Sequence, residues 1–415
     1  MKKSFLIIAA TALIMSSCSN TDLRSDIQDD LIGIDFSTFT SKQTKAGAEN
    51  SGMEEKNGLS THHTSFKVWG SKTVDETTSS VFGESNNKGT VVSYSSSTWN
   101  YSPVRFWDKS ASGYNFYAAA PKDYNWVFTS GKLSLADFAV DGTTIAASST
   151  IDPNANFGAK DIMISEDVEN YTTYTSAAVD LNFIHLLSRL NIGIKKATPS
   201  LDHTIVKLKS IKVFNMVSNG SFNEASANAS QSGNHSRWGD AATPAKFTSG
   251  VGYTTETAVT TSYNYVYQSL VIPQEVAYES GIKMDGTNIN TSTSKPYITI
   301  QYEFWTEDVA ASTYSAEEAA LYNIEKGLTS GDEGYKSAGD TKPAVPSYML
   351  DSYSYTYNLA DIFNGNGTST NYSFNEGWMN TLKITIDPIA IQFEPEVYEW
   401  KGTTDVNVNV PDINS

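Results

Sequence analysis

The 415-residue chain contains one cysteine, few charged residues and no cluster of basic residues. Charged residues make up 18% of it, and its formal net charge is -17. We expect no nucleic-acid partner, because neutralising phosphates requires clustered Lys and Arg side chains. Attraction of the surface to anionic lipid is not expected for the same reason. Any attachment to a membrane would therefore be covalent.

The sequence also lacks the motifs of the common enzyme classes. It has no G-x-S-x-G elbow, no H-E-x-x-H, no Walker-type phosphate loop and no glycine-rich dinucleotide fingerprint. The many carboxylates leave a glycosidase pair open, but no pattern indicates one. We expect no catalytic residues, no metal and no cofactor. His62 and His63 lie in a polar stretch and should be solvated, whereas His185 has apolar neighbours and should lie in the core.

No hydrophobic run is long enough to cross a membrane. The apolar segment Phe5–Met15 is about a dozen residues, too short to span roughly 30 Å of hydrocarbon as a helix. With Lys2 and Lys3 before it, the segment predicts a signal peptide over residues 1–17, whose removal takes the formal charge from -17 to -19.

The position of Cys18 directly after this segment favours a lipid acceptor, followed by a linker over residues 18–30. Met15 stands where such a site usually has Leu, so ordinary cleavage with an incidental cysteine remains the alternative. Without another cysteine, the mature chain must hold its core without disulfides, although it lies outside the cytoplasm.

What the chain does contain is typical of an all-β protein. It has 23 Tyr, 18 Phe and 8 Trp, and 27 Gly that mark frequent turns. Alternating segments recur along the chain without a sequence repeat, which argues against a propeller or solenoid. We predict two antiparallel β-sandwich domains in tandem, at residues 31–197 and 198–400.

One helix is expected, in a long insertion at about residues 305–352. Ser315 and Glu318 have capping-box spacing, and Gly327 would end the helix. Ala319, Ala320, Leu321 and Ile324 are expected to share one face of it.

Two alternating segments lie at the ends of the mature chain. Leu31–Phe39 places Ile32, Ile34 and Phe36 on one face of a strand, and the tail, residues 401–415, places Val406, Val408 and Val410 on one face of another. Lys42 and Lys45 follow the first segment and would be accessible to a trypsin-like protease. The sequence leaves open whether each segment is a permanent strand of its own sandwich.

Three aromatic residues, Trp99, Tyr101 and Trp107, lie close together in sequence. Flat aromatic side chains on a β surface suit sugar rings, so these residues are a candidate glycan-stacking platform. Alternatively, the three side chains belong to the hydrophobic core. A platform would fit a second hypothesis for function, a monomeric surface lipoprotein that binds glycans or host ligands.

Several short motifs, in order, resemble the fimbrillin-like lipoproteins, the type V pilin subunits of Bacteroidota. The resemblance covers most of the chain. In the first half it rests on the lipoprotein start, the IDFSTF strand followed by Thr44-Lys45-Ala46, FKVWG at Phe66–Gly70, the W-x-Y-x-P-x-R-x-W pattern at Trp99–Trp107, and FYAAAP at Phe116–Pro121. Further along the chain it rests on FIHLLSRLNIGI at Phe183–Ile194, LVIPQ at Leu270–Gln274, and LKITIDPIAIQF at Leu382–Phe393 with Trp400 after it.

The resemblance implies two transthyretin-like β-sandwich domains and a fimbrial subunit that supports adhesion at the cell surface. In such pilins a protease removes the first strand, and a C-terminal strand of the next subunit fills the groove. Implied partners are other fimbrial subunits, host or bacterial surface glycans or proteins, and the outer membrane through the lipid anchor. The chain departs from the family pattern at the processing site, because its only nearby arginine, Arg24, precedes the strand.

Overall fold

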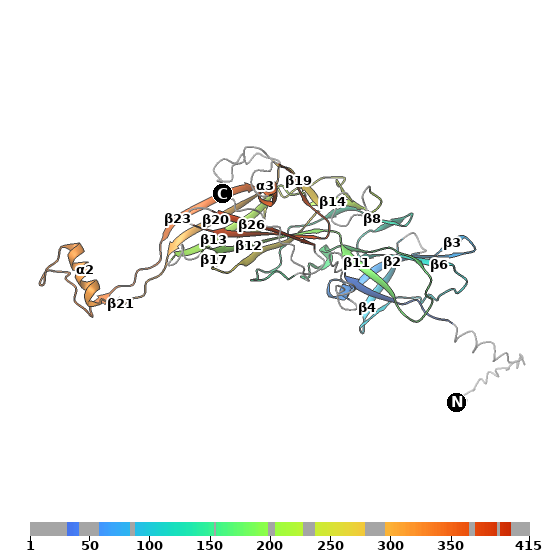
Figure 1. Cartoon of the computed structure of the whole chain (residues 1–415), viewed down its shortest axis with the longest axis horizontal. Helices are drawn as coiled ribbons and strands as arrows, with labels where there is room; N and C mark the ends of the chain where they lie inside the picture. The colour runs from blue at the N-terminus through green and yellow to red at the C-terminus, as the bar shows by residue number, and fades with distance from the viewer. Residues whose placement is uncertain are drawn as a thin grey trace, which may run out of the picture.

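The structure is a computed structural model, and it describes residues 31–40, 58–83, 88–152, 155–197, 204–226, 237–278, 295–364, 370–387 and 391–399. Strands dominate it, which confirms the all-β prediction. Figure 1 shows an elongated molecule with one β-sheet unit at each side of its centre and an arm that projects from one end. Among the described residues, no helix combines the length and apolar character that crossing a bilayer requires.

Most of the first half of the chain forms one nine-stranded sheet. Its strands pair in the order β1-β11-β9-β6-β2-β4-β5, with β10 paired to β6 and β3 to β2. The two end strands, β1 and β5, contact each other, so this sheet curls around a single core. The bounds are β1 (Phe36–Thr40), β2 (Ser65–Val74), β3 (Thr77–Phe82), β4 (Thr90–Ser95), β5 (Thr98–Asn100), β6 (Gly113–Ala120), β9 (Met163–Ser165), β10 (Val168–Tyr171) and β11 (Val179–His185).

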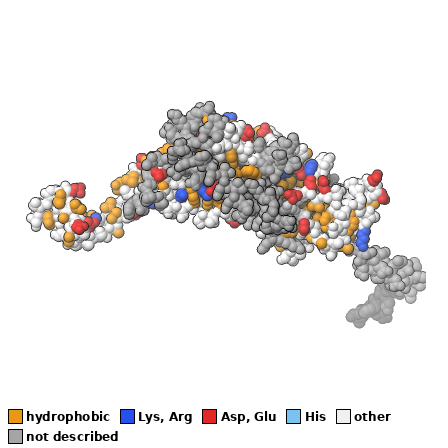
Figure 2. All heavy atoms as spheres, in the orientation of Figure 1, with side chains coloured by type: hydrophobic (Ala, Val, Ile, Leu, Met, Phe, Trp, Pro, Cys, Tyr) orange, Lys and Arg blue, Asp and Glu red, His pale blue; other side chains and the backbone are white. Residues whose placement is uncertain are grey.

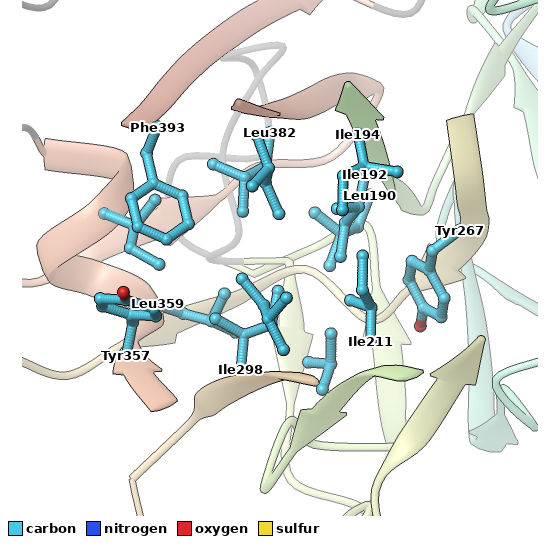
Figure 3. Close-up of a cluster of buried hydrophobic side chains, with 14 of the residues drawn as sticks. Leu190, Ile192, Ile194, Ile211, Tyr267, Ile298, Tyr357, Leu359, Leu382 and Phe393 are labelled. Carbon is cyan, nitrogen blue, oxygen red and sulfur yellow. The ribbon is translucent and has the colours of Figure 1, made fainter. Parts of the chain in front are cut away.

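The second half forms two sheets that pack face to face. One has the order β18-β12-β25-β26, and the other has the order β16-β13-β20-β23, with β17 also paired to β13. Figure 3 shows labelled side chains of both sheets pointing into the space between them. The bounds are β12 (Ser188–Lys196), β13 (Thr204–Phe214), β16 (Val251–Tyr253), β17 (Thr257–Val259), β18 (Asn264–Val271), β20 (Tyr297–Thr306), β23 (Met349–Asn358), β25 (Trp378–Ile386) and β26 (Ile391–Glu399).

A smaller sheet joins the two halves. Its order is β15 (Trp238–Gly239), β14 (Asn219–Asn223), β8 (Lys132–Ala139) and β7 (Val127–Thr129), so β8 of the first half pairs with β14 of the second. A shared apolar cluster lies beneath it and includes Trp69 from the first half and Leu270 from the second. The halves are therefore packed on each other through a common core.

The remaining elements are short. They are η1 (Gly58–Thr61), η2 (Gly158–Lys160), α2 (Ala316–Lys326), α3 (Leu359–Asn364), and the strand pairs β19 (Gln274–Val276) with β24 (Tyr372–Phe374) and β21 (Ser312–Thr313) with β22 (Thr341–Lys342).

Strand β6 shows why the first sheet forms between two apolar layers. Tyr114, Phe116 and Ala118 alternate into the core inside the curled sheet, while Tyr117 and Ala119 face the cluster shared with the second half. Because both faces are buried, the strand is apolar almost throughout. A strand of this kind fixes its own register, since a slip of one residue would exchange the two layers.

The boundary between the two units lies earlier in the chain than the predicted boundary at 197/198. Strand β12 pairs with β18 and β25 of the second unit. The boundary therefore lies between β11 and β12. The first unit also differs from the predicted pair of sheets, because its nine strands belong to a single curled sheet.

The predicted insertion and its helix are present. Ser315 caps α2 with Glu318 in a capping box, and Gly327 ends the helix with a left-handed φ of 65°. The predicted face is wrong, because Ala319 is buried whereas Leu321 and Ile324 are exposed on the other side of the helix. The helix belongs to the arm, which we define as residues 307–348, and does not cover the sandwich core (Figure 1).

Candidate functional site

The candidate site is the edge of the first sheet that β1 occupies. Five residues of β1 pair with β11 in parallel, from Phe36 opposite Val179 to Thr40 opposite Phe183. Because β1 ends the strand order, β11 is its only full-length strand partner among the described residues. Parallel pairing is slightly weaker per residue than antiparallel pairing. Side-chain contacts therefore add to what holds this strand in place.

The residues just before β1 extend the contact. The Ile34 amide donates to the Arg105 carbonyl at 2.9 Å, and the Trp107 amide donates to the Ile32 carbonyl at 3.0 Å. The Tyr101 hydroxyl donates to the Ile34 carbonyl at 2.5 Å. The segment 101–107, which follows β5, thus closes over the start of this strand.

The inward face of this segment carries Ile32, Ile34 and Phe36. Ile34 is fully buried, Phe36 is buried, and Ile32 is half-buried against the same core. The Phe36 ring meets four other rings at centroid distances of 5.4–6.3 Å, namely those of Phe66, Phe82, Tyr101 and Phe116. Aromatic pairs at such distances add to the free energy of burial. Without β1, this aromatic groove would be open to water.

Two inward positions of β1 are poorly matched to the groove. Thr38 and Thr40 are buried on the same side of the strand as Phe36, and neither side-chain hydroxyl has a hydrogen-bond partner among the described residues. A buried hydroxyl left unpaired costs about 1–3 kcal/mol. The native occupant of the edge is therefore less favourable than an apolar strand of the same shape.

The aromatic residues proposed as a glycan platform are part of the core. Trp99 and Trp107 are each 5% exposed. Trp99 packs against Phe66 at 5.0 Å, and the Trp107 indole N–H donates to the Thr175 carbonyl at 3.0 Å. Their ring faces are not available to a sugar, which corrects the stacking prediction. Together with Tyr101 they form one wall of the groove and its closing segment.

A buried polar cluster lies beside this site, and the prediction for two of its histidines is wrong. His62 and His63 are 6% and 5% exposed instead of solvated, and His185 is buried as predicted. All three surround the fully buried Asp161. His185 Nδ1 lies 2.9 Å from Asp161 Oδ1, and His63 Nε2 donates to the Asp161 carbonyl at 2.5 Å.

The charges in this cluster are set by burial. Burial lowers the pKa of His62 to about 4, and it also lowers the pKa of His63. Burial would raise the pKa of Asp161, but the adjacent histidines outweigh it and hold that pKa below its usual range. The described residues hold no group of three or more His, Cys, Asp or Glu side chains arranged to bind a metal.

The cluster anchors the residues that lead into β2. The amides of His62 and His63 donate to the Leu59 carbonyl within η1, and η1 contacts β1. Leu59 itself is fully buried in the same core as Phe36. The three histidines and Asp161 therefore fasten η1 beside the candidate site.

The other predicted site residues lie outside the described part of the chain. They are the lipidation candidate Cys18, the processing candidates Lys42 and Lys45, and the donor-strand candidates Val406, Val408 and Val410.

Together these features define an all-β protein whose N-terminal edge strand fills an aromatic groove. The model of the fimbrillin-like family matches residues 44–400, so the chain belongs to that family. No curated protein sequence matches it.

Similar solved structures cover nearly the whole chain at low identity. A fimbrial protein from Bacteroides vulgatus is 13% identical, with a TM-score of 0.43, and the match covers 89% of this chain and 99% of that one. The tip fimbrial protein Mfa3 from Porphyromonas gingivalis, with a C-terminal truncation, is 9% identical, with a TM-score of 0.38 and coverage of 88% and 100%. A fimbrial assembly protein from Parabacteroides distasonis is 11% identical, with a TM-score of 0.30 and coverage of 88% and 96%. The family assignment rests on the family model and not on these structures.

Proposed function

We propose that the protein is a fimbrial subunit that polymerises by strand exchange. In this proposal a protease cuts after Lys42 or Lys45, the segment containing β1 leaves, and the tail of another subunit takes its place on β11. Membership of the fimbrillin-like family supports a fimbrial role at the cell surface. The observation that carries the mechanism is that β1 is an edge strand seated in an aromatic groove.

The groove suits a strand with apolar side chains at alternate positions. An incoming strand would pair its backbone with β11 and place every second side chain among the aromatic residues. Val406, Val408 and Val410 have that spacing. Valine has nearly the shape of threonine without the hydroxyl, so a valine at the position of Thr38 or Thr40 would remove an unpaired buried group.

Exchange of this kind leads to a polymer. Each copy would lose a leading strand and supply a tail, so the contact is head-to-tail, and a head-to-tail contact that does not close into a ring produces a filament. Burial of each valine contributes roughly 1.5–3 kcal/mol, to which the backbone ladder adds.

Export and anchoring form a separate part of the proposal. Lipid attached to Cys18, followed by removal of the signal peptide, would tether the precursor to the outer membrane, and more than one acyl chain would be needed for stable anchoring. The projecting arm supports a tip or accessory place in the fimbria, because an insertion that lies away from the body is free for recognition (Figure 1). The burial of Trp99 and Trp107 removes the aromatic platform on which the monomeric glycan-binding alternative depended.

Limited proteolysis tests the exchange. Purified chain treated with trypsin should lose residues up to Lys42 or Lys45 and form ladders that persist in mild detergent. The same treatment of a chain that lacks residues 405–415 should give monomers only. A chain that is cut at this place, keeps its tail and stays monomeric would contradict the proposal.

A further inference from the structure

The arm is a folded unit that projects away from the two β-sheet units. It leaves the body where β20 ends and returns where β23 begins, and it projects from one end of the molecule (Figure 1). Val309 and Val345 form a β-bridge in its stalk, β21 and β22 pair further out, and α2 lies at the far end. The helix is thus carried by a two-stranded stalk.

Contacts within the arm hold α2 in one orientation. The Asn323 side chain donates to the Lys336 carbonyl at 2.7 Å and accepts from the Lys336 amide at 2.8 Å. Lys342 forms an ion pair with Glu318 at 2.8 Å. Ala319 and Asn323 are buried and mark the inner face of the helix. The outer face is therefore fixed by the arm itself.

That outer face is apolar and exposed. Leu321 and Ile324 are 66% and 77% exposed, the largest values among the exposed large apolar residues that the structure describes. Eight of the thirteen such residues lie between Val309 and Leu350, on the arm or at its base. Figure 2 shows apolar side chains gathered on the projecting end of the molecule. A large exposed apolar patch is typical of an interaction surface.

The charge around this face restricts what can bind it. Residues 307–348 contain eight acidic and three basic side chains, and acidic side chains lie beside the apolar ones in Figure 2. Glu317 precedes Leu321 by one turn of α2, and Glu325 follows Ile324 directly. Like charge disfavours anionic lipid and also a second copy of this acidic chain. Charge complementarity favours a basic partner.

We propose that the outer face of α2 docks into an apolar groove with a Lys- or Arg-rich rim on another protein. Leu321 and Ile324 would enter the groove, as the apolar side chains of a helix do in helix-in-groove recognition. Glu317 and Glu325 would pair with the basic rim. This inference stands apart from strand exchange, because the arm lies at the far end of the molecule from the candidate site (Figure 1).

A defined probe tests the chemistry of this surface. A labelled amphipathic helical peptide built only of Leu and Lys is titrated with the full chain, and fluorescence anisotropy reports binding. Substituting Leu321→Gln and Ile324→Gln together should weaken binding by about tenfold or more, because two buried apolar contacts are lost. Glu317→Gln with Glu325→Gln should weaken it and reduce its salt dependence.

Matched variants separate the arm from general charge attraction. Leu321→Met with Ile324→Met keeps helix propensity and apolar volume, so it should retain binding. Val91→Gln with Val127→Gln changes exposed valines of the first half and should leave binding unchanged. Equal binding by the Gln and Met variants of the arm would overturn the proposal. Self-association, or binding to phosphatidylcholine vesicles, that the Leu321→Gln and Ile324→Gln substitutions abolish while peptide binding stays unchanged would overturn it as well.

Discussion

At the scale of single residues, the cluster around Asp161 shows how burial decides charge. Two of the three histidines lie at the Asp161 carboxylate and His63 lies at its backbone carbonyl, so the single carboxylate could balance at most one added positive charge. His62 Nδ1 lies 3.7 Å from Asp161 Oδ2, and neither atom has a hydrogen-bond partner among the described residues. The other charged groups whose fields reach the cluster are Asp152 and Arg189. The neutral form of His62 is therefore the one that the fold stabilises.

Acid should unfold the first unit through this cluster. The pKa of His62 is about 4 in the folded chain and about 6.5 when unfolded, so the unfolded chain binds the proton first. The stability that the neutral histidine contributes is full above pH 6.5 and is lost as the pH falls towards 4. The change amounts to about 3 kcal/mol. Below that range, Asp161 adds a further loss, because its pKa is also depressed.

Urea denaturation at pH 7.5 and pH 4.5 measures this effect. The His62→Gln variant should lose less stability than the unchanged chain between these two values, since one group that titrates differently in the two states has been removed. Identical losses for both chains would show that His62 does not control the acid response.

The sequence was informative about some of these residues and misleading about others. His185 lies among Phe183, Ile184 and Leu186, and that local pattern predicted its burial correctly. His62 and His63 have polar neighbours in the chain, and their burial comes from contacts with residues about a hundred positions away. Local periodicity does not contain such contacts. The same holds for Trp99, whose ring faces a core assembled from distant strands.

At the scale of elements, the start of β1 is well packed, whereas its end, which we call the weak end, carries two unpaired buried hydroxyls. Phe36 and Ile34 fill the aromatic groove, whereas Thr38 and Thr40 place unpaired hydroxyls on the same side. A strand that must hold until processing and then leave would benefit from this combination. Its alternation was visible in the sequence, but its parallel pairing with β11, more than a hundred residues away, was not.

Replacing both threonines should hold the strand more tightly. Thr38→Val with Thr40→Val removes two unpaired buried hydroxyls while keeping the side-chain shape, and should stabilise β1 by about 1–3 kcal/mol for each position. Trypsin-treated chain carrying both substitutions should then form ladders more slowly. Hydrogen exchange of the β1 amides gives the direct readout of how tightly the strand is held.

A second pair of substitutions shows whether the effect is specific to β1. Ser221→Val with Thr257→Val removes hydroxyls on β14 and β17, outside the first sheet, that have hydrogen-bond partners in Asp137 and Tyr253, and it should not slow ladder formation. Faster exchange of β1 in the Thr38→Val and Thr40→Val chain would contradict the account of the weak end.

Helix α2 shows what local signals can and cannot predict. Its start and end follow from Ser315, Glu318 and Gly327, because capping is a local interaction. Its orientation does not, because the inner face is set by Asn323 and its contact with Lys336 across the arm. The apolar pair Leu321 and Ile324 was expected to share a face with Ala319, but Ala319 is buried whereas the pair is exposed to water.

At the scale of the whole molecule, the all-β class was predictable from the sequence. The pairing of strands from the first half of the chain with strands from the second half was not. Composition and turn residues are enough to indicate an all-β chain. The pairing of β8 with β14, and of β12 with β25, joins residues far apart in sequence and moves the boundary between the units. Because the two units share one apolar cluster, a subunit would enter a fimbria as one packed body.

The positions of the donor tail and the acceptor groove within the molecule favour a polymer. The tail is supplied after β26, in the second unit, and the groove lies in the first. A donor and an acceptor in different units of an elongated molecule favour linkage between copies over closure within one copy (Figure 1).

Disulfide trapping between β11 and the tail tests strand exchange between copies. Asp180 lies opposite Ser37 in the β1–β11 pairing and is exposed, so Asp180→Cys with Asn409→Cys, in a chain carrying Cys18→Ser, places a thiol at each partner. After trypsin and mild oxidation, we predict disulfide-linked dimers and longer chains. The Val91→Cys with Asn409→Cys control, which places the first thiol on β4 instead, should stay monomeric. Monomers alone from the Asp180→Cys and Asn409→Cys chain, with the cut at Lys42 or Lys45 complete, would contradict the account.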